Sequence, residues 1–237
     1  TQHYDYLGVN YARSMFNLDH LVTGSNDTLK VALTCIRPDM EVRYTTDGSE
    51  PQAASTLYQD SLIVTGDLTI KAATFMNGEQ KGKTLTLPLH WNKATARPVT
   101  NGNEQSYRLT NGLRGSDKQS DFEWSGWYGK DAYFTIDLGK TDSFDKVTIG
   151  CMTNYGMGAH LPKQIILSVS DNNQTFTRIA ERSFTPEQIF REGIRIEDQL
   201  FDNLKASGRY LRIDLKNPGK CPENHTRPGQ GSWVYID

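Results

Sequence analysis

Short segments in which apolar and polar residues alternate recur along the chain and are separated by turn-forming residues. Alternation with a period of two predicts a strand with one buried face, because successive side chains of a strand point to opposite sides. The segments between residues 30 and 91 read KVALTCI, EVRYTT, SLIV, LTIKAATF and KTLTLPLHW. Those between residues 132 and 237 read AYFTIDLG, FDKVTIGCM, KQIILSVS, FTRIA, IRIE, RYLRIDL and SWVYID. The pattern therefore predicts an all-β protein.

Two local signals predict particular turns. The pair Asp47-Gly48 follows the segment VRYTT, and both residue types tolerate the left-handed backbone that a tight turn requires, so we expect Gly48 at a positive φ. Thr185 precedes Pro186, which favours a single helical turn with the threonine as its cap and the proline in the first position. No other segment has a helical pattern.

The length of 237 residues is typical of two domains, each large enough to bury its own core. Residues 93–106 are polar, contain a proline and a glycine, and lack an apolar period, which is typical of a linker. We expect a small immunoglobulin-like β-sandwich at residues 18–92 and a second β-sandwich at residues 107–237. Residues 1–17 have no regular pattern, and we interpret them as the end of an upstream domain.

Charge and hydropathy exclude two classes of partner. The formal net charge is -2, and lysine and arginine are scattered along the chain, so nothing indicates binding to nucleic acid or to an anionic membrane. The chain contains no apolar run of about 18 residues, and its first ten residues lack the basic start and apolar centre of a signal peptide. We expect no membrane insertion.

The three cysteines are too few for a disulfide framework, and their number is odd. Cys35 and Cys151 alternate with apolar neighbours in predicted strands, so we expect buried thiols. Cys221 lies four residues before His225 in the loop KCPENHTRPGQG. The two could be zinc ligands, but a structural zinc site needs four, and no second pair stands at usable spacing. The spacing therefore disfavours a metal at Cys221.

The stretch SDFEWSGWYGKDAY, residues 120–133, is unusually rich in aromatic rings. Gly126 and Gly129 interrupt any period, so we interpret the stretch as a loop that leads into a strand. A sugar site needs a flat aromatic platform and a few fixed polar groups. The chain offers both, with platform candidates in this stretch and hydrogen-bonding candidates in the loop MTNYGMGAH: Trp124, Trp127, Tyr128, Asn154, Tyr155 and His160.

Two other interpretations of the ring-rich stretch remain open. Asp121, Glu123 and Asp131 have the composition of a glycosidase cleft, but acids among glycines are usually turn formers and solvated surface. Alternatively the tryptophans close one end of the sandwich, since tryptophan is highly buried on average. In SWVYID the alternation places Val234 and Ile236 in the core and leaves Trp233 and Tyr235 on the opposite face.

Several segments carry a family resemblance. EVRYTTDGSEP and LTIKAATFMNG resemble the small sandwich that follows the catalytic barrel in bacterial chitobiases and β-N-acetylhexosaminidases, and LGVNYARSMF resembles the end of the barrel of glycoside hydrolase family 20. LTNGLRGSDKQSDFEWSGWYGKDAYFTIDLG, LPKQIILSVSDNNQTF and RYLRIDLKN are similar to the coagulation-factor type C (discoidin-like) jelly-roll sandwich, which such enzymes carry as a family 32 carbohydrate-binding module.

The resemblance implies a non-catalytic C-terminal region of an exported bacterial β-N-acetylhexosaminidase, in the periplasm or at the cell surface. The family's H-x-G-G-D-E motif does not occur in the chain, so we expect no enzymatic activity from it. Its partners would be a glycan, held by the second domain, and an upstream catalytic barrel of the same polypeptide. Relatives often carry a tryptophan in the second loop, where this chain has Tyr155, Met157 and Ala159. The alternative is a pair of spacer domains that stabilise the barrel and bind no ligand.

The same resemblance implies a structural calcium ion. Relatives usually have an aspartate where Asn111 stands, and their last strand usually runs on into a glutamate, whereas this sequence stops at Asp237. Calcium takes six to eight oxygen ligands. Residues 109–117 offer only part of such a shell, with Asn111 and Asp117 as the candidate ligands.

Overall fold

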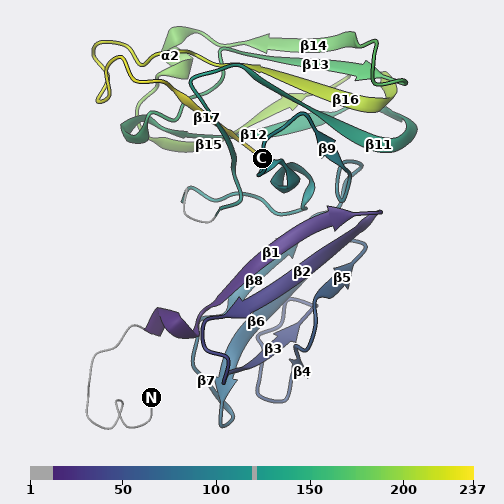
Figure 1. Ribbon diagram of the computed structural model, residues 1–237, viewed down its shortest axis with the longest axis vertical. Helices are drawn as coiled ribbons and strands as arrows, with labels where there is room; N and C mark the ends of the chain where they lie inside the picture. Colours follow the sequence, from purple (N-terminus) through teal and green to yellow (C-terminus); the bar gives the residue numbers. More distant parts are fainter. Residues whose placement is uncertain (1–12, 119–121) are drawn as a thin grey trace. The chain divides into compact units, whose positions relative to one another are not determined.

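The computed structural model describes residues 13–118 and 122–237, and the chain divides into two compact units that meet in sequence near Trp91 and Asn92. Both units are built almost entirely from antiparallel strands (Figure 1). The all-β class and the series of two sandwiches predicted from the alternation are therefore confirmed. Of the expected remnant of an upstream domain at residues 1–17, most lies outside the described residues.

The first domain consists of two sheets. One contains β1 (Leu18–Ser25), β2 (Thr28–Cys35) and β5 (Leu62–Val64). The other contains β4 (Thr56–Leu57), β3 (Glu41–Thr45), β6 (Leu68–Met76), β7 (Glu79–Gln80) and β8 (Leu85–Leu89), the last paired with β6. Their inward side chains form the core, which includes Val22, Leu29, Val31, Leu33, Val64, Ile70, Phe75, Leu87 and Leu89.

The predicted strands of this domain are confirmed as β2, β3, β5, β6 and β8, whereas β1, β4 and β7 were not predicted. The strand β1 has one fully buried side chain, Val22, so its sequence shows little alternation. The short 3-10 helix η1 (Arg13–Phe16) precedes it. Phe16 is buried, and its carbonyl accepts a hydrogen bond from Thr74 Oγ1 at 2.6 Å. Cys35 was expected to be buried but is partly exposed at the end of β2.

The tight turn at Asp47-Gly48 has the predicted conformation, with Gly48 at φ +79°. Asp47 Oδ1 accepts hydrogen bonds from the amide and the hydroxyl of Ser49, at 3.0 and 2.6 Å. The Gly48 amide donates to the Thr69 carbonyl at 3.1 Å. A Cβ at position 48 would lie 3.6 Å from the nearest atom of Thr69, which is ordinary contact. The requirement for glycine is therefore conformational and not steric.

The second domain contains a four-stranded and a five-stranded sheet (Figure 1). The four-stranded sheet has the order β10 (Ser125–Tyr128), β17 (Trp233–Ile236), β12 (Val147–Asn154) and β15 (Ile194–Phe201). The five-stranded sheet has the order β14 (Thr177–Ser183), β13 (Gln164–Ser170), β16 (Ala206–Lys216), β11 (Ala132–Phe144) and β9 (Val99–Thr100). Side chains from both sheets form one core that includes Trp127, Phe134, Ile149, Cys151, Ile165, Leu167, Ile213, Val234 and Ile236.

Most local predictions for the second domain hold, and two differ. The helix α2 (Pro186–Ile189) is capped by Thr185 as predicted. Part of the segment interpreted as a linker forms β9, which pairs with β11, and the 3-10 helix η2 (Ser106–Thr110) follows it. The ring-rich stretch interpreted as a loop contains β10, because its backbone pairs with β17. Gly126 is required within β10, since the ring of Tyr235 lies where a Cβ would be, at 2.4 Å.

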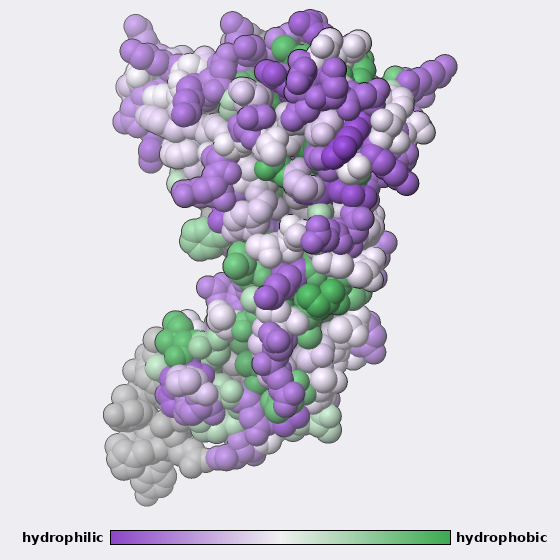
Figure 2. Space-filling view, turned by 45° about the vertical axis from the view of Figure 1, so that its right-hand side comes forward, coloured by the Kyte–Doolittle hydropathy of each residue, from purple (hydrophilic) through white to green (hydrophobic). Residues whose placement is uncertain are grey.

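Hydrophilic side chains predominate on the face drawn in Figure 2, and hydrophobic ones form smaller patches.

Cys151 lies in the core as predicted, and burial raises the pKa of its thiol to about 12. This thiol is therefore protonated and unreactive at neutral pH.

An ion pair stabilises the irregular part of β11, where the register with β16 shifts between Asp137 and Asp142. Asp137 accepts two hydrogen bonds from Arg209, at 2.8 and 2.9 Å, and a third from the Gly139 amide at 2.8 Å. The hydrogen bond from Arg209 is the largest cause that lowers the pKa of the Asp137 carboxyl. The charged carboxylate is therefore the stabilising form.

Replacing Gly48 with alanine should lower the free energy of unfolding by about 1 kcal/mol or more, because a side chain disfavours the positive φ. Thermal melting of the purified chain measures this cost. Asp47→Asn is a matched control that should melt close to the parent, since the amide oxygen can still accept the Ser49 amide. A neutral Gly48→Ala variant would contradict the turn assignment.

Asp137→Asn should destabilise the second domain by about 1 kcal/mol at about pH 7, since the charge-assisted pair is partly exposed and only part of its energy is retained. A lowered folded-state pKa means that the stabilisation is present above the unfolded value of about 4 and is lost as the pH falls through the folded value. In urea unfolding, the difference between parent and variant should shrink below about pH 4. An undiminished difference at about pH 3 would contradict this role for the carboxylate.

Candidate functional site

Three loops meet at one end of the second domain: residues 129–131 after β10, residues 155–163 after β12, and residues 217–232 between β16 and β17. The strand β17 holds them together because it lies between β10 and β12. The Trp233 amide donates to the Gly158 carbonyl at 2.8 Å, and the His160 amide donates to the Trp233 carbonyl at 2.9 Å. These two bonds attach the second loop to the first residue of β17, which directly follows the third loop.

Tyr128 is the exposed aromatic ring at this junction, with 48% of its surface accessible. Its hydroxyl accepts a hydrogen bond from the Gly231 amide at 3.1 Å. The ring lies directly against Gly231, where a Cβ would come within 2.9 Å of it. The ring of Trp233 contacts Tyr128 with a centroid distance of 5.0 Å and a tilt of 46°. Tyr128 is thus exposed and also held in place.

A small aromatic cluster continues from Tyr128 over the outer face of the four-stranded sheet. Trp233 stacks on Tyr235 with a centroid distance of 5.3 Å. Tyr235 is buried there with Trp124, Met152 and Ala159, while Val234 and Ile236 lie in the main core. The alternation predicted for the last strand is therefore confirmed.

Trp124 and Trp127 do not form a ligand platform, and this part of the site prediction is wrong. Trp127 is 7% exposed, because β10 directs it into the core, where it stacks on Phe134 at 6.0 Å. Trp124 is 2% exposed, and its indole nitrogen donates to the Ser116 carbonyl at 2.8 Å. Neither tryptophan has a ring face open to a ligand, so both are structural.

The second loop contains the predicted polar candidates Asn154, Tyr155 and His160. Asn154 caps the 3-10 helix η4 (Tyr155–Met157) by accepting the Met157 amide at 3.2 Å. Tyr155 is partly exposed, and its ring contacts that of His225 at 4.0 Å. His160 is 1% exposed, so it cannot reach a ligand at the surface, and its predicted role is wrong. Burial, followed by the nearby His225, lowers the pKa of His160 to about 4.

Arg227 is a candidate that the sequence analysis missed. Its Nε donates to the Gly156 carbonyl at 3.0 Å, which places an exposed guanidinium group between the second and third loops. The only sequence signal was an arginine in a loop rich in glycine and proline. Such a loop has no alternation from which the direction of a side chain can be inferred.

The loop that contains the predicted calcium ligands has a network of its own hydrogen bonds. Asn111 is buried, its amide nitrogen donates to Glu123 Oε2 at 2.8 Å, and its Oδ1 accepts the Leu113 amide at 2.9 Å. Asp237 Oδ2 accepts the Gly115 amide at 2.8 Å. Asp117 is exposed. Calcium binding by Asn111 and Asp117 stays a prediction.

The carboxylates considered for catalysis have structural partners. Glu123 accepts the Asn111 amide, and Asp131 accepts hydrogen bonds from Lys216 Nζ and the Asn217 amide, both at 2.9 Å. The third member, Asp121, lies outside the described residues. These contacts favour turn and surface roles for Glu123 and Asp131.

The fold and the loop cluster define a discoidin-like β-sandwich domain that follows a smaller sandwich. Residues 93–233 match the F5/8 type C domain, and residues 22–86 match the Chitobiase/beta-hexosaminidase C-terminal domain. The chain therefore belongs to the F5/8 type C domain family. No curated protein matched it in a sequence search. No helix in the described ranges has the length and apolar character of a membrane span.

Three solved structures illustrate the similarity. CpGH89CBM32-6 from Clostridium perfringens is 15% identical, with 61% of this chain and 90% of that chain covered and a TM-score of 0.34. The Streptococcus pneumoniae fucose binding module SpX-3 is 12% identical, with 62% and 97% covered and a TM-score of 0.36. A putative chitobiase fragment from Bacteroides thetaiotaomicron is 14% identical, with 47% and 67% covered and a TM-score of 0.30.

Trp127→Ala should lower the free energy of unfolding by about 3–5 kcal/mol, because it leaves a cavity beside Phe134 in the core. Trp127→Phe should lose less, since a ring still fills part of the space. Denaturant unfolding of the two variants measures the difference. If Trp127→Ala unfolded at the same denaturant concentration as the parent, the core position of this ring would be contradicted.

Proposed function

We propose that the second domain binds a carbohydrate at the junction of the three loops, with Tyr128 as the stacking ring. The observation that carries the proposal is the exposed ring of Tyr128, fixed by Gly231 and Trp233 at a point where three loops meet. A pyranose has an apolar face of C–H groups, which stacks on an aromatic ring, and a rim of hydroxyls. A ring that is already held in place loses little conformational freedom when a sugar binds.

Polar groups of the second and third loops would pair with the sugar hydroxyls. Arg227 brings several N–H donors, and Asn154 and Tyr155 bring an amide and a hydroxyl. The hydrogen bond from Arg227 to Gly156 orients the guanidinium group next to η4. We assign specificity to these groups because hydroxyl pairing distinguishes one sugar from another, whereas the aromatic platform accepts many.

The match of residues 22–86 to the Chitobiase/beta-hexosaminidase C-terminal domain supports a second part of the proposal. We infer that the chain is the non-catalytic C-terminal region of an exported bacterial β-N-acetylhexosaminidase of glycoside hydrolase family 20. Its catalytic barrel would precede the first sandwich in the same polypeptide, and the protein would act in the periplasm or at the cell surface. The second domain would then keep the enzyme close to its glycan substrate.

One observation favours an alternative in which both domains are spacers without a ligand. The two tryptophans of the ring-rich stretch are buried, as expected if that stretch only closes the sandwich. The two functions differ in what they require of Tyr128, because a spacer has no use for a rigid exposed ring.

Tyr128→Ala should weaken sugar binding by about 1–3 kcal/mol, or on the order of 5- to 150-fold, while the melting temperature changes little. The parent is first screened on a glycan array that includes galactose, N-acetylgalactosamine and N-acetylglucosamine, and its best ligand is then titrated calorimetrically. Tyr133→Ala is the matched control, because Tyr133 is also exposed, at 41%, but pairs with Asp214 and packs on Arg212 in the other sheet.

Equal binding by Tyr128→Ala and the parent would contradict the assigned platform. A parent that bound no glycan on the array would favour the spacer function instead.

A further inference from the structure

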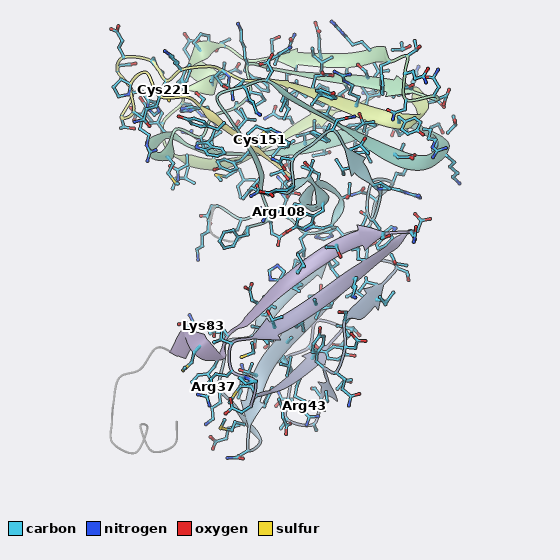
Figure 3. All side chains as sticks on the ribbon, in the orientation of Figure 1. Arg37, Arg43, Lys83, Arg108, Cys151 and Cys221 are labelled. Atoms are coloured by element: carbon cyan, nitrogen blue, oxygen red, sulfur yellow. The ribbon has the colours of Figure 1, made fainter. Side chains whose placement is uncertain are left out.

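A second cluster of functional groups lies beneath the same loops and consists of His160, Cys221 and His225. All three side chains are buried, with exposures of 1%, 4% and 4%. Their ligand atoms all lie within 4.8 Å of one another. His160 comes from the loop after β12, while Cys221 and His225 come from the loop between β16 and β17. Figure 3 labels Cys221 in that loop, at the end of the sandwich and well apart from Cys151.

Two nitrogens of this cluster lack hydrogen-bond partners in the part of the chain that the structure describes. They are Nδ1 of His160 and Nε2 of His225, both inaccessible to solvent. The backbones of Ile189 and Tyr155 interact with these two rings respectively, but outside hydrogen-bond geometry. Leaving a buried polar atom unpaired is costly, so Nε2 of His225 indicates a bonding partner within the cluster, whereas Nδ1 of His160 is not the nitrogen that faces Cys221.

The distance between two of the ligand atoms fits a tetrahedral metal ion. Cys221 Sγ lies 3.7 Å from His160 Nε2. With Zn–S and Zn–N bonds of about 2.3 and 2.0–2.1 Å, tetrahedral angles place a sulfur and a nitrogen ligand about 3.5 Å apart. One thiolate and two imidazoles form a donor set of intermediate softness, which suits zinc and excludes calcium and magnesium as the preferred ions.

We propose that His160, Cys221 and His225 bind a zinc ion, with an exogenous ligand such as water in the fourth position. Three protein ligands and one open position are a recognised zinc arrangement. In the metal-free state the Cys221 thiol faces His160 Nε2, and zinc takes the place of the thiol proton. Binding therefore forms a Zn–S bond, releases one proton to solvent and leaves all oxidation states unchanged.

Neighbouring side chains orient His160 for binding, whereas His225 must change its hydrogen bonding in order to bind. The ring of His160 lies against Phe190 at 4.9 Å and Tyr155 at 6.0 Å, and these contacts orient the ring. His225 Nδ1 accepts the Arg227 amide at 2.8 Å, so its neutral ring carries the proton on Nε2. Coordination by Nε2 moves that proton to Nδ1 and releases the Arg227 amide. We therefore expect the turn around residues 225–227 to rearrange on binding.

The ion would cross-link two of the loops that surround Tyr128. His160 and Cys221 are 61 positions apart in the sequence, so the unfolded chain does not hold them together, and zinc binding would stabilise the folded state. Sequence spacing disfavours this site because only Cys221 and His225 are neighbours in the sequence. The third ligand is His160, which β17 positions because the Trp233 carbonyl accepts a hydrogen bond from the His160 amide.

Metal titration of the chelator-treated, reduced chain tests the proposal. The parent should bind about one zinc ion per chain in competition with a chromophoric chelator, and its melting temperature should rise. Cobalt in place of zinc should give a thiolate-to-cobalt charge-transfer band and strong tetrahedral d–d bands, which report Cys221 directly without any variant. Each outcome is expected from a site that includes a sulfur ligand.

Matched variants identify the ligands. Cys221→Ser and His160→Gln should weaken zinc binding by on the order of 100-fold or more, and His225→Gln by at least about 10-fold. Cys35→Ser removes a thiol of the first domain and should bind zinc like the parent. Tyr128→Ala should also bind zinc like the parent. Circular dichroism of the metal-free variants checks that they fold.

Three results would overturn the proposal: no stoichiometric zinc binding by the parent, a cobalt spectrum without the thiolate band, or unchanged binding by a folded Cys221→Ser variant.

Discussion

The position of β17 between β10 and β12 is the constraint on which the rest of the second domain depends. Its residues pair with residues 125–128 on one side and with residues 151–152 on the other, so each pairing joins segments about 80 to 110 positions apart in the sequence. Such pairing is entropically costly because long loops must close first. The burial of Val234 and Ile236 in the main core offsets this cost.

The register of this pairing also decides which rings are exposed. Trp127 is opposite Val234, and Tyr128 is opposite Trp233. Because neighbouring residues of a strand face opposite sides, Trp127 enters the core while Tyr128 and Trp233 lie outside it. A shift by one residue would reverse every one of these assignments, so the exposure of the proposed platform Tyr128 depends on the same hydrogen bonds as the core.

The two proposed sites share the loops that β17 holds together and differ in depth. Tyr128 and Arg227 lie at the surface, where a sugar could reach them, while the side chains of His160 and Cys221 are buried. Tyr155 lies between the two levels, because its ring contacts His225 on one side and is partly exposed on the other. A metal ion below would therefore influence the rigidity of the groups above.

The sequence by itself determined the features that depend on a few neighbouring residues. Strict alternation predicted strands such as β6 and β16, Thr185 and Pro186 predicted α2, and the pair Asp47-Gly48 predicted its turn. Tertiary structure decided which rings of residues 120–133 are buried and whether Cys221 has a third partner. No sequence pattern distinguishes the buried rings of Trp124 and Trp127 from the exposed ring of Tyr128. His160 is also far from Cys221 in the sequence. Periodicity records which side of a strand a residue faces, but the burial of a ring and the gathering of ligands depend on distant strands that pack against it.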